Sequence, residues 1–184
     1  MNVLQCEEAP FGEHEFEPDL EYDPSGATVN CSLCGLSIEE FHNAQKLDKS
    51  FFLAGHAVFT IECPDNHYTF QVKKAKSDKP LFDKPLYFVS LLTGPDNTRD
   101  FTYVGVMGKD GKLRLTGKSK FNEGTYTVRL FRRTMAVIWA GEQEKMHKKG
   151  YYVHHEGKCG RCGRRLTVPE SVRSGIGPEC AKHV

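Results

Sequence analysis

Four residues near the C-terminus have the types and spacing of a metal site. Cys159 and Cys162 form a C-x-x-C pair, and Cys180 and His183 form a C-x-x-H pair after an interval of seventeen residues. Zinc takes four nitrogen or sulfur ligands in a tetrahedron, and two such pairs joined by a connector satisfy that geometry. We therefore predict that these four side chains bind Zn2+.

The residues around the two pairs predict how they are held. Glycines follow each cysteine of the first pair, which favours a tight knuckle. Pro178 suits the first turn of a helix, on which Cys180 and His183 would lie one turn apart on the same face. A knuckle, a connector and such a helix make a treble clef, or zinc ribbon. His155 is the alternative fourth ligand. A site closed by four protein ligands favours a structural role over catalysis.

The N-terminal part contains a second candidate zinc site. Cys31 and Cys34 form another C-x-x-C pair, His42 lies on a helix expected over residues 38–46, and His14 lies upstream. Cys6 is the rival of His14 as the remaining ligand. Residues 1–50 contain few large apolar side chains, and metal commonly substitutes for a missing core in segments of this size.

Charge is strongly segregated along the chain. Residues 1–50 carry eleven acidic and two basic side chains, whereas the remaining 134 residues carry 23 basic and 13 acidic ones. A basic body of this kind can bind a polyanion. The alternative is a solvated surface whose acidic and basic parts attract each other.

The hydrophobic pattern predicts an α+β fold with three segments: an acidic zinc-finger-like module (1–50), a β-rich core (51–150) and a C-terminal zinc module (151–184). Five alternating or apolar runs predict an antiparallel five-stranded sheet. They are residues 56–63, 67–74, 86–94, 101–108 and 112–117. Residues 125–140 are interpreted as a helix packed on this sheet, and residues 142–150 as a basic linker. Cys63 is expected to be an ordinary buried thiol.

The sequence also indicates a cellular setting. It has no apolar run of about twenty residues and no basic, apolar start typical of a signal peptide. We therefore expect a cytoplasmic protein. A reducing compartment disfavours disulfides, which supports the interpretation of the cysteines as metal ligands.

The C-terminal sequence resembles a known family. The run from His155 to Cys180 fits the pattern H-x-G-x-C-x-x-C-G-R-x-L-T-x-P-x-S followed by G-I-G-P-x-C. This is similar to the ending of an uncharacterised family of bacteriophage-borne proteins, a domain of unknown function. The resemblance implies zinc and a phage origin, hence a host-cell cytoplasm, but no activity. It also places a histidine at position 155, which supports that residue as the alternative ligand.

Nucleic-acid binding is the first functional hypothesis. Arginines surround the predicted knuckle, and lysines follow a run that contains Tyr68 and Phe70. Arginine pairs well with phosphate, and exposed aromatic rings can stack on unpaired bases. Core packing is the preferred interpretation of the two aromatic residues, because both alternate in phase with Val72. The candidate contact residues are Arg161, Arg164, Arg165, Arg173, Lys73, Lys74 and Lys76.

A second hypothesis is an effector that binds a host protein, involved in defence or transcription, through the acidic N-terminal module. Catalysis is not expected, because we find no supported nucleophile–base arrangement, phosphate-binding glycine loop or deaminase motif. His154, His155 and Glu156 are better explained by a zinc ligand and its neighbours. The identity of the partner and the oligomeric state do not follow from the sequence.

Overall fold

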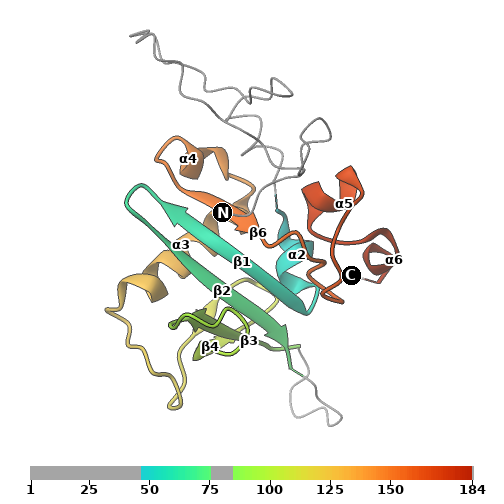
Figure 1. The fold of residues 1–184 in the computed structure, drawn as a ribbon. Coiled ribbons are helices and arrows are strands. Elements are labelled where there is room, and N and C mark those ends of the chain that lie inside the picture. Colours follow the sequence, from blue (N-terminus) through green and yellow to red (C-terminus); the bar gives the residue numbers. More distant parts are fainter. Residues whose placement is uncertain (1–46, 76–84, 184) are drawn as a thin grey trace, which may run out of the picture.

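The structure is a computed structural model that describes residues 47–75 and 85–183. Its centre is an antiparallel six-stranded sheet with the order β5-β4-β3-β2-β1-β6 (Figure 1). The strands are β1 (His56–Cys63), β2 (Asn66–Lys74), β3 (Tyr87–Leu92), β4 (Phe101–Met107), β5 (Leu113–Arg114) and β6 (Tyr152–His155). The helices are α2 (Lys49–Leu53), α3 (Tyr126–Ala140), α4 (Glu144–His147), α5 (Pro169–Ser174) and α6 (Pro178–Ala181).

One face of the sheet is buried and the other is not. Along β1, Ala57, Phe59 and Ile61 are fully buried, while the residues between them are partly or fully exposed. β3 alternates in the same way, and β1 pairs with β2 in continuous register from His56 opposite Lys73. Successive side chains of a strand point to opposite faces, so this alternation defines a core face and an open face.

Helix α3 covers the core face, as the sequence predicted. Phe131 packs against Phe59 and Phe70, with ring centroids 6.2 and 5.1 Å apart. The helix ends at Gly141, whose φ of 73° is the left-handed conformation common after a helix C-terminus. Arg129 and Arg133 are exposed on the solvent side of this helix.

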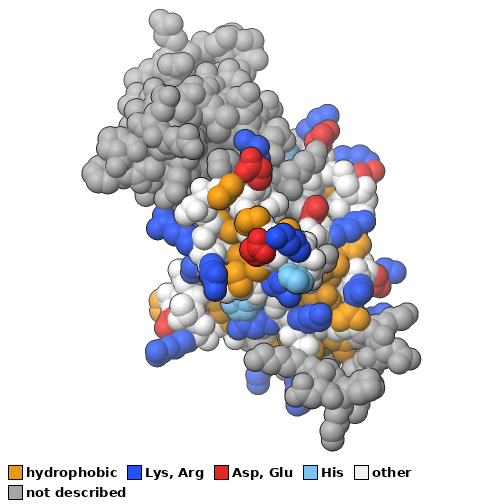
Figure 2. Space-filling model, turned by 90° about the vertical axis from the view of Figure 1, so that its right-hand side faces the viewer, with side chains coloured by type: hydrophobic (Ala, Val, Ile, Leu, Met, Phe, Trp, Pro, Cys, Tyr) orange, Lys and Arg blue, Asp and Glu red, His pale blue; other side chains and the backbone are white. Residues whose placement is uncertain are grey.

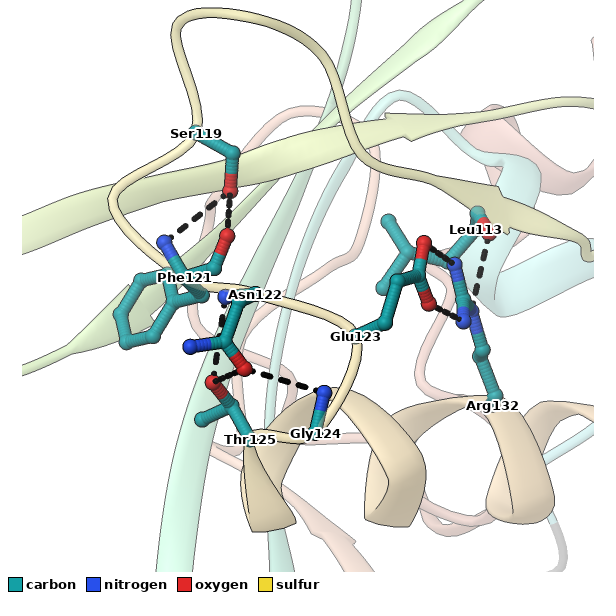
Figure 3. A network of polar contacts seen from close by, with 8 residues as sticks. All are labelled: Leu113, Ser119, Phe121, Asn122, Glu123, Gly124, Thr125 and Arg132. Carbon is teal, nitrogen blue, oxygen red and sulfur yellow. Dashed lines mark hydrogen bonds and ion pairs between the residues drawn. The ribbon is translucent and has the colours of Figure 1, made fainter.

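A polar network fixes the start of α3 to the edge of the sheet (Figure 3). Arg132 donates to the Leu113 carbonyl of β5 (3.1 Å) and forms an ion pair with Glu123. The Asn122 side chain accepts hydrogen bonds from the backbone N–H of Gly124 and the hydroxyl of Thr125. Arg132 therefore anchors β5 to α3.

Two expectations about the chain need correction. The sheet has a sixth strand within the described residues, because β6 pairs with β1 from Phe59 opposite His155 to Glu62 opposite Tyr152. Residues 142–150 were expected to be a linker but include helix α4, which buries Met146. β6 is a four-residue strand with two histidines, and its partner is far away in the chain. A local hydrophobic pattern could not have revealed it.

Several predictions fall outside the described residues: the helix over 38–46, the second zinc site of His14, Cys31, Cys34 and His42, and the contact residue Lys76. Among the residues described, no helix has the length and apolar character needed to cross a membrane.

Candidate metal centre and adjoining basic surface

Residues 156–183 follow β6 and are called the C-terminal module. They consist of a knuckle (residues 158–165) and the two short helices α5 and α6. The knuckle is closed by backbone hydrogen bonds from Cys159 N–H to the Arg164 carbonyl (2.8 Å) and from Gly163 N–H to the Cys159 carbonyl (2.9 Å). Gly163 has a φ of 74°, which only glycine adopts readily. Helix α6 starts with Pro178, as the sequence predicted, and carries Cys180.

The fold brings three of the predicted ligands together. The Sγ atoms of Cys159, Cys162 and Cys180 all lie within 4.8 Å of one another. All three are free thiols; Cys159 is buried, Cys180 is partly buried and Cys162 is exposed. Three converging thiols that are not joined as disulfides can hold a metal ion, and sulfur is a ligand that zinc accepts.

Backbone groups around Cys159 favour its thiolate. Burial opposes ionisation of this thiol, but N–H groups of Gly177, Cys162 and Arg161 outweigh burial and lower the pKa of Cys159 to about 7. Gly177 N–H donates to Cys159 Sγ at 3.4 Å. A hydrogen bond with Cys162 raises the pKa of Cys180, as expected when neighbouring thiols compete to ionise. A bound cation would stabilise the thiolate forms of these side chains.

The two candidate fourth ligands lie in different settings. His183 is exposed and lies beyond α6, which ends at Ala181, so only Cys180 of the predicted pair is on the helix; the His183 N–H donates to the Cys180 carbonyl (3.1 Å). His155 is buried, and both of its ring nitrogens are engaged. Nε2 donates to the Val172 carbonyl (2.5 Å), and Nδ1 accepts from Gly157 N–H (2.9 Å). Neither ring lies within the cluster of three thiols. The fourth ligand stays a prediction.

The knuckle is docked onto the sheet at the start of β1. The N–H of His56 donates to the Gly160 carbonyl (2.6 Å), and Gly160 N–H donates to the Gly175 carbonyl (2.9 Å). Both glycines lie against the ring of Phe51, a fully buried residue of α2. Figure 1 shows the module, with α5 and α6, beside α2 at this end of the sheet.

The predicted arginines are exposed around this docked module: Arg161, Arg164, Arg165 and Arg173. Lys73 and Lys74 are also exposed, and Lys73 is the cross-strand partner of His56, the residue that binds the knuckle. Lys and Arg side chains are more frequent than Asp and Glu on this side of the molecule (Figure 2). The exposure of these residues is compatible with the predicted contact surface, and their role in binding stays a prediction.

The structure confirms core packing for two aromatic residues. Phe70 is fully buried. Tyr68 is partly buried on the same face, and its ring centroid lies 5.8 Å from that of Tyr126 of α3. Both pack on the helix-covered side of the sheet, so core packing is the correct interpretation. Cys63 is buried on that face as predicted. Sequence reasoning missed Phe88, which is exposed on the open face.

Comparison with known proteins gives a family match in the C-terminal part of the chain. Residues 152–184 match DUF6011, described as a family of unknown function. This match covers β6 and the C-terminal module, including the three clustered cysteines. No curated protein matches the chain, and no solved structure does so either.

Proposed function

We propose that this protein is a zinc-binding, non-enzymatic protein that binds nucleic acid through its C-terminal module and the adjoining end of the sheet. The observation that supports the proposal is the docking of the cysteine knuckle at the start of β1, where His56 bonds to Gly160 and lies opposite Lys73 of β2. The exposed arginines Arg161, Arg164 and Arg165 belong to this docked knuckle. The zinc ion would be held by Cys159, Cys162 and Cys180, with His183 as the fourth ligand.

The role proposed for zinc is to hold charge in place. The knuckle backbone is closed by hydrogen bonds, and its arginines lie between or directly after the ligands. A bound ion would therefore limit the freedom of their backbone. Guanidinium groups bind phosphate oxygens with two parallel hydrogen bonds, and each phosphate contact releases counterions. The energy of binding would come from the arginines and lysines, with no chemical step at the metal.

Fluorescence anisotropy with labelled DNA and RNA at low salt tests the proposal. Arg164→Gln combined with Arg165→Gln should weaken binding about tenfold or more, because two phosphate contacts are lost. The matched control is Arg129→Gln combined with Arg133→Gln, which removes equal charge from the solvent side of α3. Equal effects of the two pairs, or no binding by the unaltered protein, would refute the proposal.

The acidic N-terminal sequence supports a second candidate, an effector that binds a host protein. Eleven acidic residues within residues 1–50 give that segment a net charge opposite to the rest of the chain. Deletion of residues 1–30 separates the possibilities. A segment that screens the basic surface predicts tighter nucleic-acid binding after deletion. A segment that binds a protein partner predicts loss of that partner with no gain in nucleic-acid affinity.

A further inference from the structure

The open face of the sheet carries a row of aligned side chains that the sequence did not reveal. Lys73 lies opposite Phe88, Phe88 opposite Val106, and Val106 opposite Arg114, across strands β2 to β5. Directly paired residues of antiparallel strands present their side chains on the same face. We call these four residues the open-face row.

The exposed members of the row combine an aromatic ring with positive charge. Phe88 retains 45% of its surface exposed, and Lys73 and Arg114 are also exposed. Neighbouring strands are about 4.8 Å apart, so the backbone positions of Lys73 and Arg114 lie about 5 and 10 Å from that of Phe88, on opposite sides of it. Within residues 47–75 and 85–183, neither Lys73 nor Arg114 forms an ion pair.

The ring of Tyr103 supports Phe88 as a platform, and Thr116 in turn restrains Tyr103. Tyr103 of β4 lies edge-on to it, with ring centroids 6.3 Å apart and planes at 64°. Its hydroxyl lies 3.2 Å from the Thr116 hydroxyl, which restrains the tyrosine ring. A base that stacked on the exposed ring of Phe88 would therefore meet a surface held in place from the side.

The open-face row leads toward the C-terminal module. His56 is the next residue along it, opposite Lys73, and a Cβ at Gly163 of the knuckle would lie 3.8 Å from His56 Nδ1. A ligand that runs along the row therefore reaches the knuckle at Gly163, which Arg164 directly follows.

We propose that the open face binds a single strand of nucleic acid, with an unpaired base stacked on Phe88 and backbone phosphates on Lys73 and Arg114. This rests on the proposed function and specifies its ligand. Aromatic platforms flanked by cations are typical of single-strand binding. A protein partner fits less well, because the centres of protein interfaces are depleted in lysine. A duplex keeps its bases stacked inside and offers none to Phe88.

The test compares the zinc-loaded full chain on labelled dT20, U20 and a 20-base-pair duplex. The unaltered protein should bind at least one single strand more tightly than the duplex. Phe88→Ala should weaken single-strand binding about tenfold, because one stacked base is lost. Phe88→Trp should retain it. Tyr126→Ala is the matched control, since Tyr126 is equally exposed (46%) but lies on α3. Circular dichroism establishes that each variant is folded.

The outcomes separate this inference from the proposed function. Binding of single strands and duplex with equal affinity, unaffected by Phe88→Ala, would overturn the single-strand platform and leave nucleic-acid binding intact. Absence of binding to all three probes would overturn both. A loss with Phe88→Ala that Phe88→Trp does not restore, or that Tyr126→Ala reproduces, would also overturn the platform.

Discussion

His155 is the residue whose role changes most between sequence and structure. Its position before the knuckle made it a candidate ligand, yet its ring is fully enclosed and makes two hydrogen bonds within the module. A buried imidazole with both nitrogens paired holds β6 to α5. Sequence spacing gives the distance of a histidine from a cysteine along the chain, but not the direction of its ring.

The burial of His155 predicts its titration. Burial lowers its pKa below the usual 6.5; the hydrogen bond to the Val172 carbonyl opposes this, and the neighbouring His154 adds to it. The neutral form with the proton on Nε2 should persist at pH 6.5. Between pH 6.5 and the lower pKa of the folded protein, His155 is protonated in the unfolded chain but stays neutral in the folded one. The free energy of unfolding therefore decreases as the pH falls through this range. NMR titration of the zinc-loaded protein measures this, and a His155 pKa above 6.5 would contradict it.

Gly175 is a second residue with a specific prediction. It adopts a φ of 71°, and an added Cβ would lie 2.4 Å from the buried ring of Phe51. Gly175→Ala should therefore cost about 1 to 2 kcal/mol for the left-handed backbone and about 1 to 3 kcal/mol more for the clash. Chemical denaturation of the zinc-loaded protein measures the loss.

Gly141→Ala is the matched control for this substitution. Gly141 has a φ of 73° but nothing within 4 Å of an added Cβ. It should show the backbone cost alone. Equal destabilisation by the two alanines would contradict the close packing of the module on α2.

At the scale of elements, β6 couples the C-terminal module to the sheet. The residues of β6 up to His155 pair with β1, and the knuckle that follows accepts a hydrogen bond from His56 at the start of β1. The helices of the module are only four and six residues long and bury few side chains. Helices this short are not stable alone, so their order should depend on the metal.

Metal removal should therefore loosen the module before the sheet. Treatment with a chelator should increase amide hydrogen exchange in α5, α6 and the knuckle, while the paired amides of β1 to β4 stay protected by α3. Hydrogen-exchange mass spectrometry resolves these segments. Readdition of Zn2+ should restore protection. Unchanged exchange in the module after the metal has been removed would contradict a structural role for the ion.

Strands β1 to β5 and α3 could be predicted from the hydrophobic period because their signals are local. Phe59 and Ile61 alternate along one strand, and Phe131 and Met135 recur along one helix. β6, the burial of His155 and the open-face row depend on pairing between distant segments. Lys73, Phe88 and Arg114 have no relation in the sequence; strand register alone aligns them.

At the scale of the whole molecule, charge on the open face should determine how binding responds to salt. The logarithm of affinity for a single strand falls with the logarithm of salt concentration by about 0.7 per phosphate contact. Lys73→Gln with Arg114→Gln should reduce this slope by about 1.4. Arg129→Gln with Arg133→Gln on α3 should leave it unchanged. Anisotropy titrations over a range of salt concentrations give the slopes, and equal slopes for both pairs would contradict binding on the open face.

The central claim is that Cys159, Cys162 and Cys180 together hold one zinc ion, and zinc content per chain tests it most directly. Elemental analysis should compare the unaltered protein with Cys159→Ser combined with Cys162→Ser, each purified without chelators. The comparison is independent of any zinc bound by residues 1–46, because both proteins contain them. We predict that the variant contains one zinc ion fewer per chain. Equal zinc content in the two proteins would contradict the account.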